Sequence, residues 1–222
     1  MLLPALLTKA VACGVMMLTP WHPRLGADSY SSISAGALQH HGYRFEARYV
    51  SPGNPLTLQE HRRLERHHIR IIVTWEYGAR DYMGGYREGR LEARAAQAQC
   101  KAAGIYHAPV YFAVDSDVVG LYGNVGLHNL AAYLMGAAAV LGVHRVGLYG
   151  GYPEVRLAHH RHLASFFWQT SAWSYGKWLD AAQIHQGRGG EGNHYVADYN
   201  VPFAGTTLDR DWAVKRYYGG AG

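Results

Sequence analysis

The sequence predicts a single α/β domain, folded as a TIM-type (β/α)8 barrel that is trimmed in its last third. Short runs of β-branched and aromatic residues alternate with helix-forming stretches, the order that parallel βαβ units require. Eight such runs occur, which favours a closed barrel over an open sheet. The 222 residues are enough for one barrel, but the last third leaves little room for full helices between its strands.

The first half of the chain provides four expected strands, at residues 25–28, 44–50, 69–76 and 110–115. Three helices are expected between them. Ser34 is an N-cap by type for a helix over 34–41, and Thr57 with Glu60 three residues later forms a capping box for the next. The third covers the Ala- and Gln-rich residues 90–103 after a Gly- and Tyr-rich loop, and Gly104 ends it.

The second half continues this alternation with shorter elements. A long Ala- and Leu-rich helix over 124–141 ends at Gly142, and a short helix is expected over 153–163. Expected strands are residues 145–149, 166–169, 183–186 and 195–198. The glycines between the last two strands indicate a loop at the rim of the barrel rather than a phosphate-binding loop.

The N-terminus is expected to be separate from the barrel, with residues 1–23 as an apolar extension and residues 24–218 as the barrel. Lys9 interrupts the apolar run, whereas a secretory leader has its positive charge before the run. The run is also short and interrupted for a membrane span. We interpret it as a retained segment that packs on the domain or forms an assembly contact with a partner.

Composition narrows the partners. The net charge of +5 suits an anionic partner such as a bacterial cell wall, a nucleic acid or an acidic membrane face. No zinc finger, RNA-binding signature or basic run interleaved with aromatics occurs, so we expect no nucleic-acid partner. The cysteines, Cys13 and Cys100, give no disulfide framework, although one bridge between them stays open. Cys100 lies in a helical stretch and is expected to be a small buried hydrophobe.

Acidic residues follow several expected strands at their C-terminal ends, where barrel enzymes carry their reactive groups. These residues are Asp28, Glu76, Asp115 and Asp198. Asp117 lies two residues after Asp115, so both should point to the same side, about 7 Å apart at their Cα atoms. One such acid is more often a cap for the next helix, but four strand ends sharing the feature predict a common site.

Crowded carboxylates raise one another's pKa, so one can stay protonated while another is ionised. Glycosidic bond cleavage needs this pair, because the leaving oxygen is protonated while a carboxylate stabilises the cationic centre. Mg²⁺ or Ca²⁺ binding is the rival use of clustered carboxylates. The histidines lie on expected helix surfaces without HExxH spacing, so we expect no metal site and no cofactor.

Several motifs occur in an order that resembles a known family: GADSYSSIS, GYRFEARYVS, VYFAVDSDV, VGLYGGY, FFWQTSAWS and HYVADYN. The chain resembles, over roughly residues 26–200, the glycoside-hydrolase-like domain of actinobacterial secreted proteins and of phage lysins or tail proteins. That domain is itself similar to the family 25 lysozymes, which are N-acetylmuramidases.

The resemblance implies roles by position. Asp115 and Asp117 match the Asp-x-Glu pair of the muramidases, whose second member is the general acid, while Asp28 and Asp198 match carboxylates that support them. The expected cleft-lining residues are Tyr49, Tyr149, Trp168, Gln169 and Trp173. Two departures stand out. Asp117 replaces a longer Glu, so it reaches less far toward a leaving oxygen. GADS has no aromatic before its aspartate.

Three hypotheses follow. The first is an extracellular or virion-associated hydrolase that cuts the glycan strands of peptidoglycan, with Asp117 as acid and Glu76 as the alternative acid. The second is a barrel that binds glycan without cleaving it, as a wall-facing component of a phage tail or secreted complex. The third is a divalent-metal hydrolase, whose activity a chelator would abolish.

Overall fold

The computed structural model describes residues 26–186 and 199–201. The expected N-terminal extension, Cys13, the expected strand at 195–198 and Asp198 lie outside the described residues.

Seven parallel strands form a curled sheet in sequence order. They are β1 (Gly26–Ser29), β2 (Phe45–Val50), β3 (Arg70–Trp75), β4 (Val110–Ala113), β5 (Val146–Gly150), β6 (Phe166–Thr170) and β7 (Ile184–Gln186). A short β8 (Tyr199–Val201) pairs antiparallel with both β7 and β1, so the strand pairings run in a ring. The α/β class and the parallel sheet are confirmed. The regular barrel of eight parallel strands is not, because β8 runs in the opposite direction.

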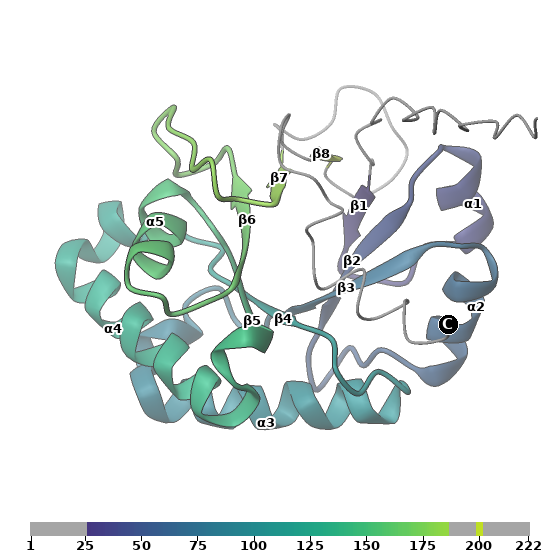
Figure 1. The fold of residues 1–222 in the computed structure, drawn as a ribbon, viewed down its shortest axis with the longest axis horizontal. Helices are drawn as coiled ribbons and strands as arrows, with labels where there is room; N and C mark the ends of the chain where they lie inside the picture. The colour runs from purple at the N-terminus through teal and green to yellow at the C-terminus, as the bar shows by residue number, and fades with distance from the viewer. Residues whose placement is uncertain (1–25, 187–198, 202–222) are drawn as a thin grey trace, which may run out of the picture.

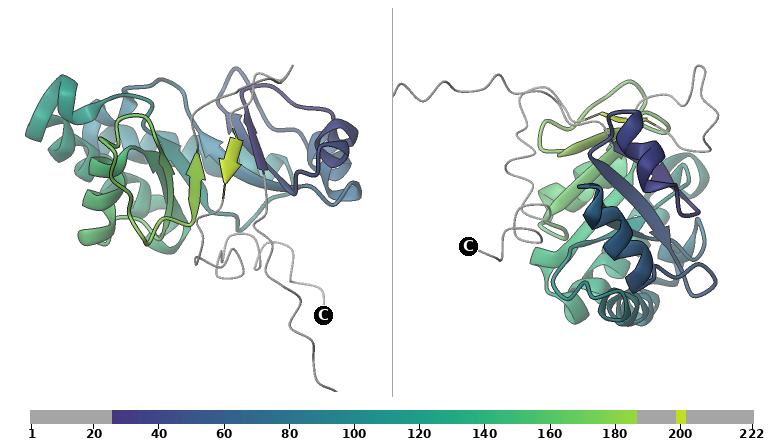
Figure 2. Two further views of the ribbon diagram at one scale, coloured as in Figure 1. Left: turned by 90° about the horizontal axis from the view of Figure 1, so that it is seen from above. Right: turned by 90° about the vertical axis from the view of Figure 1, so that its right-hand side faces the viewer.

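Helices cover the outside of the sheet on three sides (Figure 1). They are α1 (Ala35–His40), α2 (Leu58–Arg66), α3 (Gly85–Ala102), α4 (Val118–Leu141) and α5 (Tyr152–His160), with 3₁₀ turns η1 (Asp81–Gly84) and η2 (Val143–Arg145). The right-hand view of Figure 2 shows α1 and α2 together on the outer face. Among the described residues no helix follows α5, in agreement with the trimming expected from the sequence.

The segment expected to be a Gly- and Tyr-rich loop is partly helical. It forms η1 and the first turn of α3, and Gly85 makes the bend between them with φ +60°. Gly89 and Gly136 then let α3 and α4 approach closely. A Cβ on Gly89 would lie 2.0 Å from the carbonyl oxygen of Tyr133, and one on Gly136 would lie 2.1 Å from that of Tyr86. These glycines are therefore needed for helix packing.

Helix α4 also starts earlier than expected, at Val118 rather than at residue 124. Its backbone leaves the helical conformation at Gly123, with φ 52° and ψ −136°, so the first turn is set apart from the long apolar helix that the composition indicates. The helix ends at Gly142, in agreement with the expectation, in the left-handed region with φ +78°.

The expected capping box at α2 forms only in part. The Thr57 hydroxyl accepts the Glu60 backbone N–H at 3.1 Å, as an N-cap does. The Glu60 carboxylate instead accepts from Nε of Arg48 at 2.8 Å in a buried ion pair. Arg48 also donates to the carbonyl oxygen of Tyr30 at 2.6 Å. The arginine thus links β2, α2 and the segment after β1.

Two apolar cores lie on the two faces of the curled sheet. The larger fills the space between sheet and helices and contains Cys100, which is buried as expected. The smaller fills the interior and consists of Phe45, Ala47, Ile72, Tyr111, Ala113, Tyr149, Phe166, Trp168 and Ile184, with Tyr49 at its edge. Alternate residues of a strand face the same side, so the interior-facing series of β3 and β4 continues into Glu76 and Asp115.

Candidate active site

Three of the predicted acids lie at the C-terminal ends of strands β1, β3 and β4 of the curled sheet, and we call Asp28, Glu76 and Asp115 the acid group. Asp28 lies in β1 opposite Ala47, an interior residue of β2, and is 6% exposed. Glu76 directly follows β3 and is half-buried, whereas Asp115 lies two residues beyond β4 and is exposed. The group therefore runs from the buried interior to the surface.

Tyr49 is influenced electrostatically by all three acids. Burial raises the pKa of Tyr49 most, and the phenol of the neighbouring Tyr149 raises it further. The next contributions come from the charges of the acid group: Asp28, Glu76 and Asp115. Electrostatic effects of this kind decline with distance. The charges of all three acids thus act on one half-buried phenol.

Glu76 has the properties of a group that exchanges a proton near neutral pH. Burial raises its pKa from 4.5 to about 7, and the negative charges of Asp115 and then Asp81 add to the shift. Both causes disfavour the charged carboxylate. A carboxyl group with this pKa is partly protonated at pH 7 and can act as a general acid.

Asp28 is oriented by a chain of hydrogen bonds that crosses the sheet interior. The Tyr149 hydroxyl donates to Oε1 of Gln186 at 2.6 Å. Nε2 of Gln186 in turn donates to Oδ2 of Asp28 at 3.0 Å. Sequence reasoning did not identify Gln186 as a site residue. Gln186 could have been found from its position at the C-terminal end of a short strand, the same feature that identified the acids.

An aromatic floor lies beneath the acid group. The ring centroids of Tyr149 and Trp168 are 4.5 Å apart, and Tyr49 lies 6.4 Å from Tyr149 and 6.2 Å from Trp168. Trp168 is fully buried, so it shapes the site from below rather than contacting solvent. Tyr49 is the half-buried member and faces the acids.

Asp117 does not join the acid group. It is the N-cap of α4, and its Oδ1 accepts the Gly120 backbone N–H at 2.8 Å. The Tyr175 hydroxyl donates to the same carboxylate at 2.7 Å. The charge of Asp117 raises the pKa of Glu154 and of Tyr175, whereas the charges acting on Glu76 are those of Asp115 and Asp81.

Gln169 faces away from the interior, on the opposite side of β6 from Trp168. Its Nε2 donates to Oγ of Ser174 at 2.9 Å and to the Lys177 carbonyl oxygen at 2.8 Å, and its Oε1 accepts the Leu179 N–H at 2.9 Å. It therefore holds the segment after β6 rather than lining a cleft. Trp173 lies in this segment and is half-buried.

Metal binding was the rival use of the acids. Within residues 26–186 and 199–201, no three His, Cys, Asp or Glu side chains are grouped so that they could hold a metal ion.

Comparisons with known proteins agree with this architecture. The model of the Rv2525c-like, glycoside hydrolase-like domain matches residues 36–211. The candidate peptidoglycan hydrolase Rv2525c of Mycobacterium tuberculosis is 30% identical over 141 residues, which cover 60% of this chain and 57% of that protein. The chain thus spans a little over half the length of this curated relative.

Solved structures show the same fold. The crystal structure of the Tat-secreted Rv2525c of Mycobacterium tuberculosis with L-tartrate matches with a TM-score of 0.72 and 26% identity, over 82% of this chain and 95% of that one. The spore cortex lytic enzyme SleM of Clostridium perfringens matches in fold, with a TM-score of 0.54 and 12% identity over 84% of this chain and 68% of SleM. The chain belongs to the Rv2525c-like, glycoside hydrolase-like domain family.

Proposed function

We propose that this protein is a glycoside hydrolase directed at peptidoglycan, with Glu76 as its general acid. The observation that carries the proposal is the position of the half-buried Glu76 at the end of β3, with the exposed Asp115 following the neighbouring β4. Burial and the charge of Asp115 raise the pKa of Glu76 to about 7. A hydrolase of glycosidic bonds needs one protonated and one ionised carboxyl group. Asp117 is the less suitable acid because its carboxylate already accepts bonds from Gly120 and Tyr175.

In the proposed reaction, Glu76 donates its proton to the glycosidic oxygen as the bond from that oxygen to the anomeric carbon breaks. Ionised Asp115 stabilises the positive charge that develops on the sugar. Water adds to the anomeric carbon and its proton returns to Glu76. Asp28, held by Gln186, adds negative charge beneath the sugar, and we propose that Asp198 joins it from outside the described residues.

The substrate is proposed from the family and the charge. The relative Rv2525c carries the name of a candidate peptidoglycan hydrolase and is described as Tat-secreted. We propose that this chain likewise acts outside the cell, on the glycan strands of the wall, and the net charge of +5 favours such an anionic surface. The assembly role of residues 1–23 also stays a proposal.

A second function is a glycan-binding domain without turnover. It is favoured by the engagement of Asp117, the position to which the muramidase resemblance assigns the acid, as cap and hydrogen-bond acceptor. The two functions are separated by the release of reducing ends from purified peptidoglycan. The hydrolase releases them and Glu76→Gln does not. If the wild type binds the polymer and releases none, the binding function replaces the enzyme.

A further inference from the structure

Most exposed aromatic side chains of the described residues lie in segments that follow the strands. Among the described residues, the exposed Tyr and Trp side chains that follow a strand or begin the next helix are Tyr30, Tyr77, Tyr86, Tyr175 and Trp178. Tyr106 lies between α3 and β4, at the opposite end of the strands. Two of the five belong to one segment, residues 171–183 between β6 and β7, which we call the β6–β7 arm.

The β6–β7 arm is held in a fixed shape. Gln169 binds it at three positions, and Oγ of Ser174 accepts the Tyr152 N–H at 2.9 Å. Trp173 and Tyr175 have positive φ angles of 54° and 52°, which residues with aromatic side chains rarely adopt. Strain of this kind persists where the surroundings impose it, often at ligand sites. The arm therefore presents its side chains in a set arrangement.

Tyr175 places one end of the arm beside Asp117, two residues after Asp115 in the chain. It is 58% exposed, yet its hydroxyl donates to Asp117 at 2.7 Å. Asp117 follows Asp115 by two residues, so their Cα atoms are at most about 7 Å apart. The exposed ring of Tyr175 is thus held at the same end of the sheet as Asp115.

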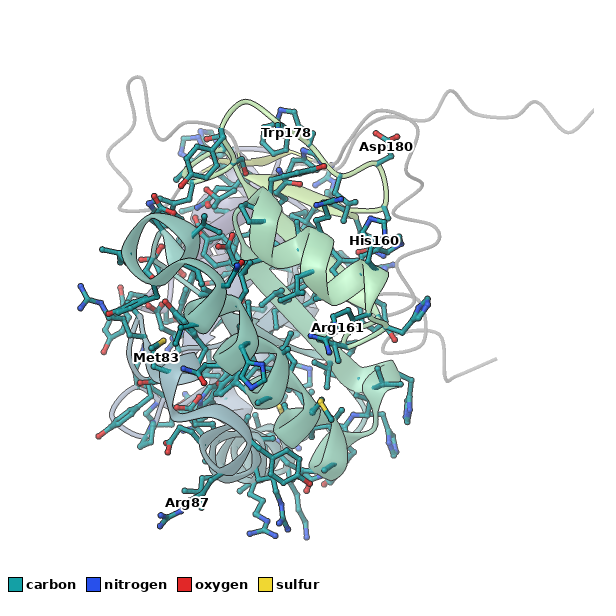
Figure 3. All side chains as sticks on the ribbon, turned by 90° about the vertical axis from the view of Figure 1, so that its left-hand side faces the viewer. Met83, Arg87, His160, Arg161, Trp178 and Asp180 are labelled. Carbon is teal, nitrogen blue, oxygen red and sulfur yellow. The ribbon has the colours of Figure 1, made fainter. Side chains whose placement is uncertain are left out.

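Trp178 is supported by β7 on the other side of the arm. Its ring lies 4.4 Å from that of His185, with an angle of 31° between the planes, and 39% of the residue stays exposed. His185 faces the outer side of β7, opposite to Gln186 and Asp28, so Trp178 lies on the outer wall of the sheet. Figure 3 shows Trp178 and Asp180 of the arm at the edge of the molecule, opposite Arg87 of α3.

We propose that the β6–β7 arm is a glycan subsite outside the acid group, in which Tyr175 and Trp178 stack on sugar rings of a strand that extends beyond the cleaved bond. Sugar rings present apolar C–H faces that aromatic rings cover well. A ring that is already fixed loses little conformational entropy on binding. Asp117 is then a positioning residue that holds Tyr175. This inference rests on the proposed glycan substrate.

The test compares ligands of two lengths, β-1,4-linked N-acetylglucosamine dimer and hexamer, by isothermal titration calorimetry. Tyr175→Ala and Trp178→Ala should each raise the Kd for the hexamer about tenfold, as loss of an aromatic anchor does, and change the dimer Kd less than about twofold. Tyr106→Ala, exposed on the far face, is the matched control and should change neither. Hexamer affinities equal to that of Tyr106→Ala would overturn the subsite, and so would equal weakening for both lengths.

Tyr175→Phe tests the positioning role, because it keeps the ring and removes only the hydrogen bond to Asp117. It should weaken hexamer binding by about threefold, between wild type and Tyr175→Ala. Hexamer binding as tight as the wild type's would remove Asp117 from the proposal. A protein that shows the length dependence but releases no reducing ends keeps the subsite and loses the hydrolase. If the protein cleaves peptidoglycan and the aromatic variants bind the hexamer as the wild type does, the hydrolase is kept and the subsite is lost.

Discussion

Gln186 donates a hydrogen bond of 3.0 Å to Asp28, which lies 158 residues earlier in the chain. This bond joins β7 to β1 across the interior of the curled sheet, and the Tyr149 hydroxyl extends it to β5. The deepest acid of the candidate site is therefore oriented by the late part of the fold. The orientation of Asp28 therefore depends on β7 lying close to β1.

Gln186→Leu should test this link. The substitution removes both hydrogen bonds and leaves the buried Asp28 carboxylate without the amide donor, so we expect the free energy of unfolding to fall by about 2–3 kcal/mol. Denaturant unfolding measures it. Gln97→Leu, on an exposed position of α3, is the control and should shift stability by less than about 0.5 kcal/mol. Equal stability of the two variants would show that the bond is not formed in solution.

Because α3 and α4 cross closely, the effect of a Gly→Ala substitution on stability should depend strongly on its position. Gly89→Ala would place its Cβ 2.0 Å from the Tyr133 carbonyl oxygen, so the helices must separate, at a cost of about 1–3 kcal/mol. Gly36→Ala in α1 meets no atom nearer than 3.8 Å and should stabilise by about 0.5–1 kcal/mol. Thermal unfolding of the two variants should shift in opposite directions. A Gly89→Ala protein as stable as wild type would contradict the crossing.

Arg48 predicts the cost of breaking a buried ion pair. Arg48→Met leaves the buried Glu60 carboxylate without its cation and frees the segment at Tyr30, so we expect a loss of about 3 kcal/mol. The double variant Arg48→Met with Glu60→Gln should recover part of this, because the uncompensated charge is removed. A double variant no more stable than Arg48→Met would show that the charge of Glu60 is not the cause.

Glu76 predicts how stability depends on pH. In the folded state, burial and then the charge of Asp115 raise the pKa of Glu76 to about 7. The contribution of Glu76 to the free energy of unfolding is therefore fully present below the unfolded pKa near 4.5, and it is lost as pH rises through about 7. Because Glu76 is only half-buried, screening reduces the effect to about 1–2 kcal/mol. Stability relative to Glu76→Gln should therefore decline between pH 5 and 8. A difference that stays constant over this range would contradict the raised pKa.

Much of the architecture could be predicted from the sequence, because the periodicity of the hydrophobic residues indicates strands and helices and glycines mark the ends of helices. The alternation of β-branched runs with helical stretches predicted the parallel sheet, and Gly104 and Gly142 predicted the ends of α3 and α4. Gly89 could not be interpreted correctly, since a glycine in a loop and one at a helix crossing look alike in sequence. The antiparallel direction of β8 was also hidden, because a three-residue strand carries no directional pattern.

The candidate site was predicted in part for a similar reason. Glu76 and Asp115 continue the interior series of β3 and β4, which places both at the C-terminal end of the sheet, and their role at a site stays a prediction. Asp117 has the same spacing, but the chain turns into α4 after Asp115, and a carboxylate at that turn becomes an N-cap. Gln186 was missed because its role depends on partners in two distant strands.

The pKa of Glu76 itself tests the central claim most directly. Carbon-13 NMR titration of the glutamate side-chain carboxyls, with Glu76→Gln to assign the resonance, measures it without any substrate. We expect a midpoint of about 7 that moves toward lower pH in Asp115→Asn, because the neighbouring negative charge is removed. A midpoint near 4.5 that Asp115→Asn leaves unchanged would contradict the shared acidic site and the proposed acid together.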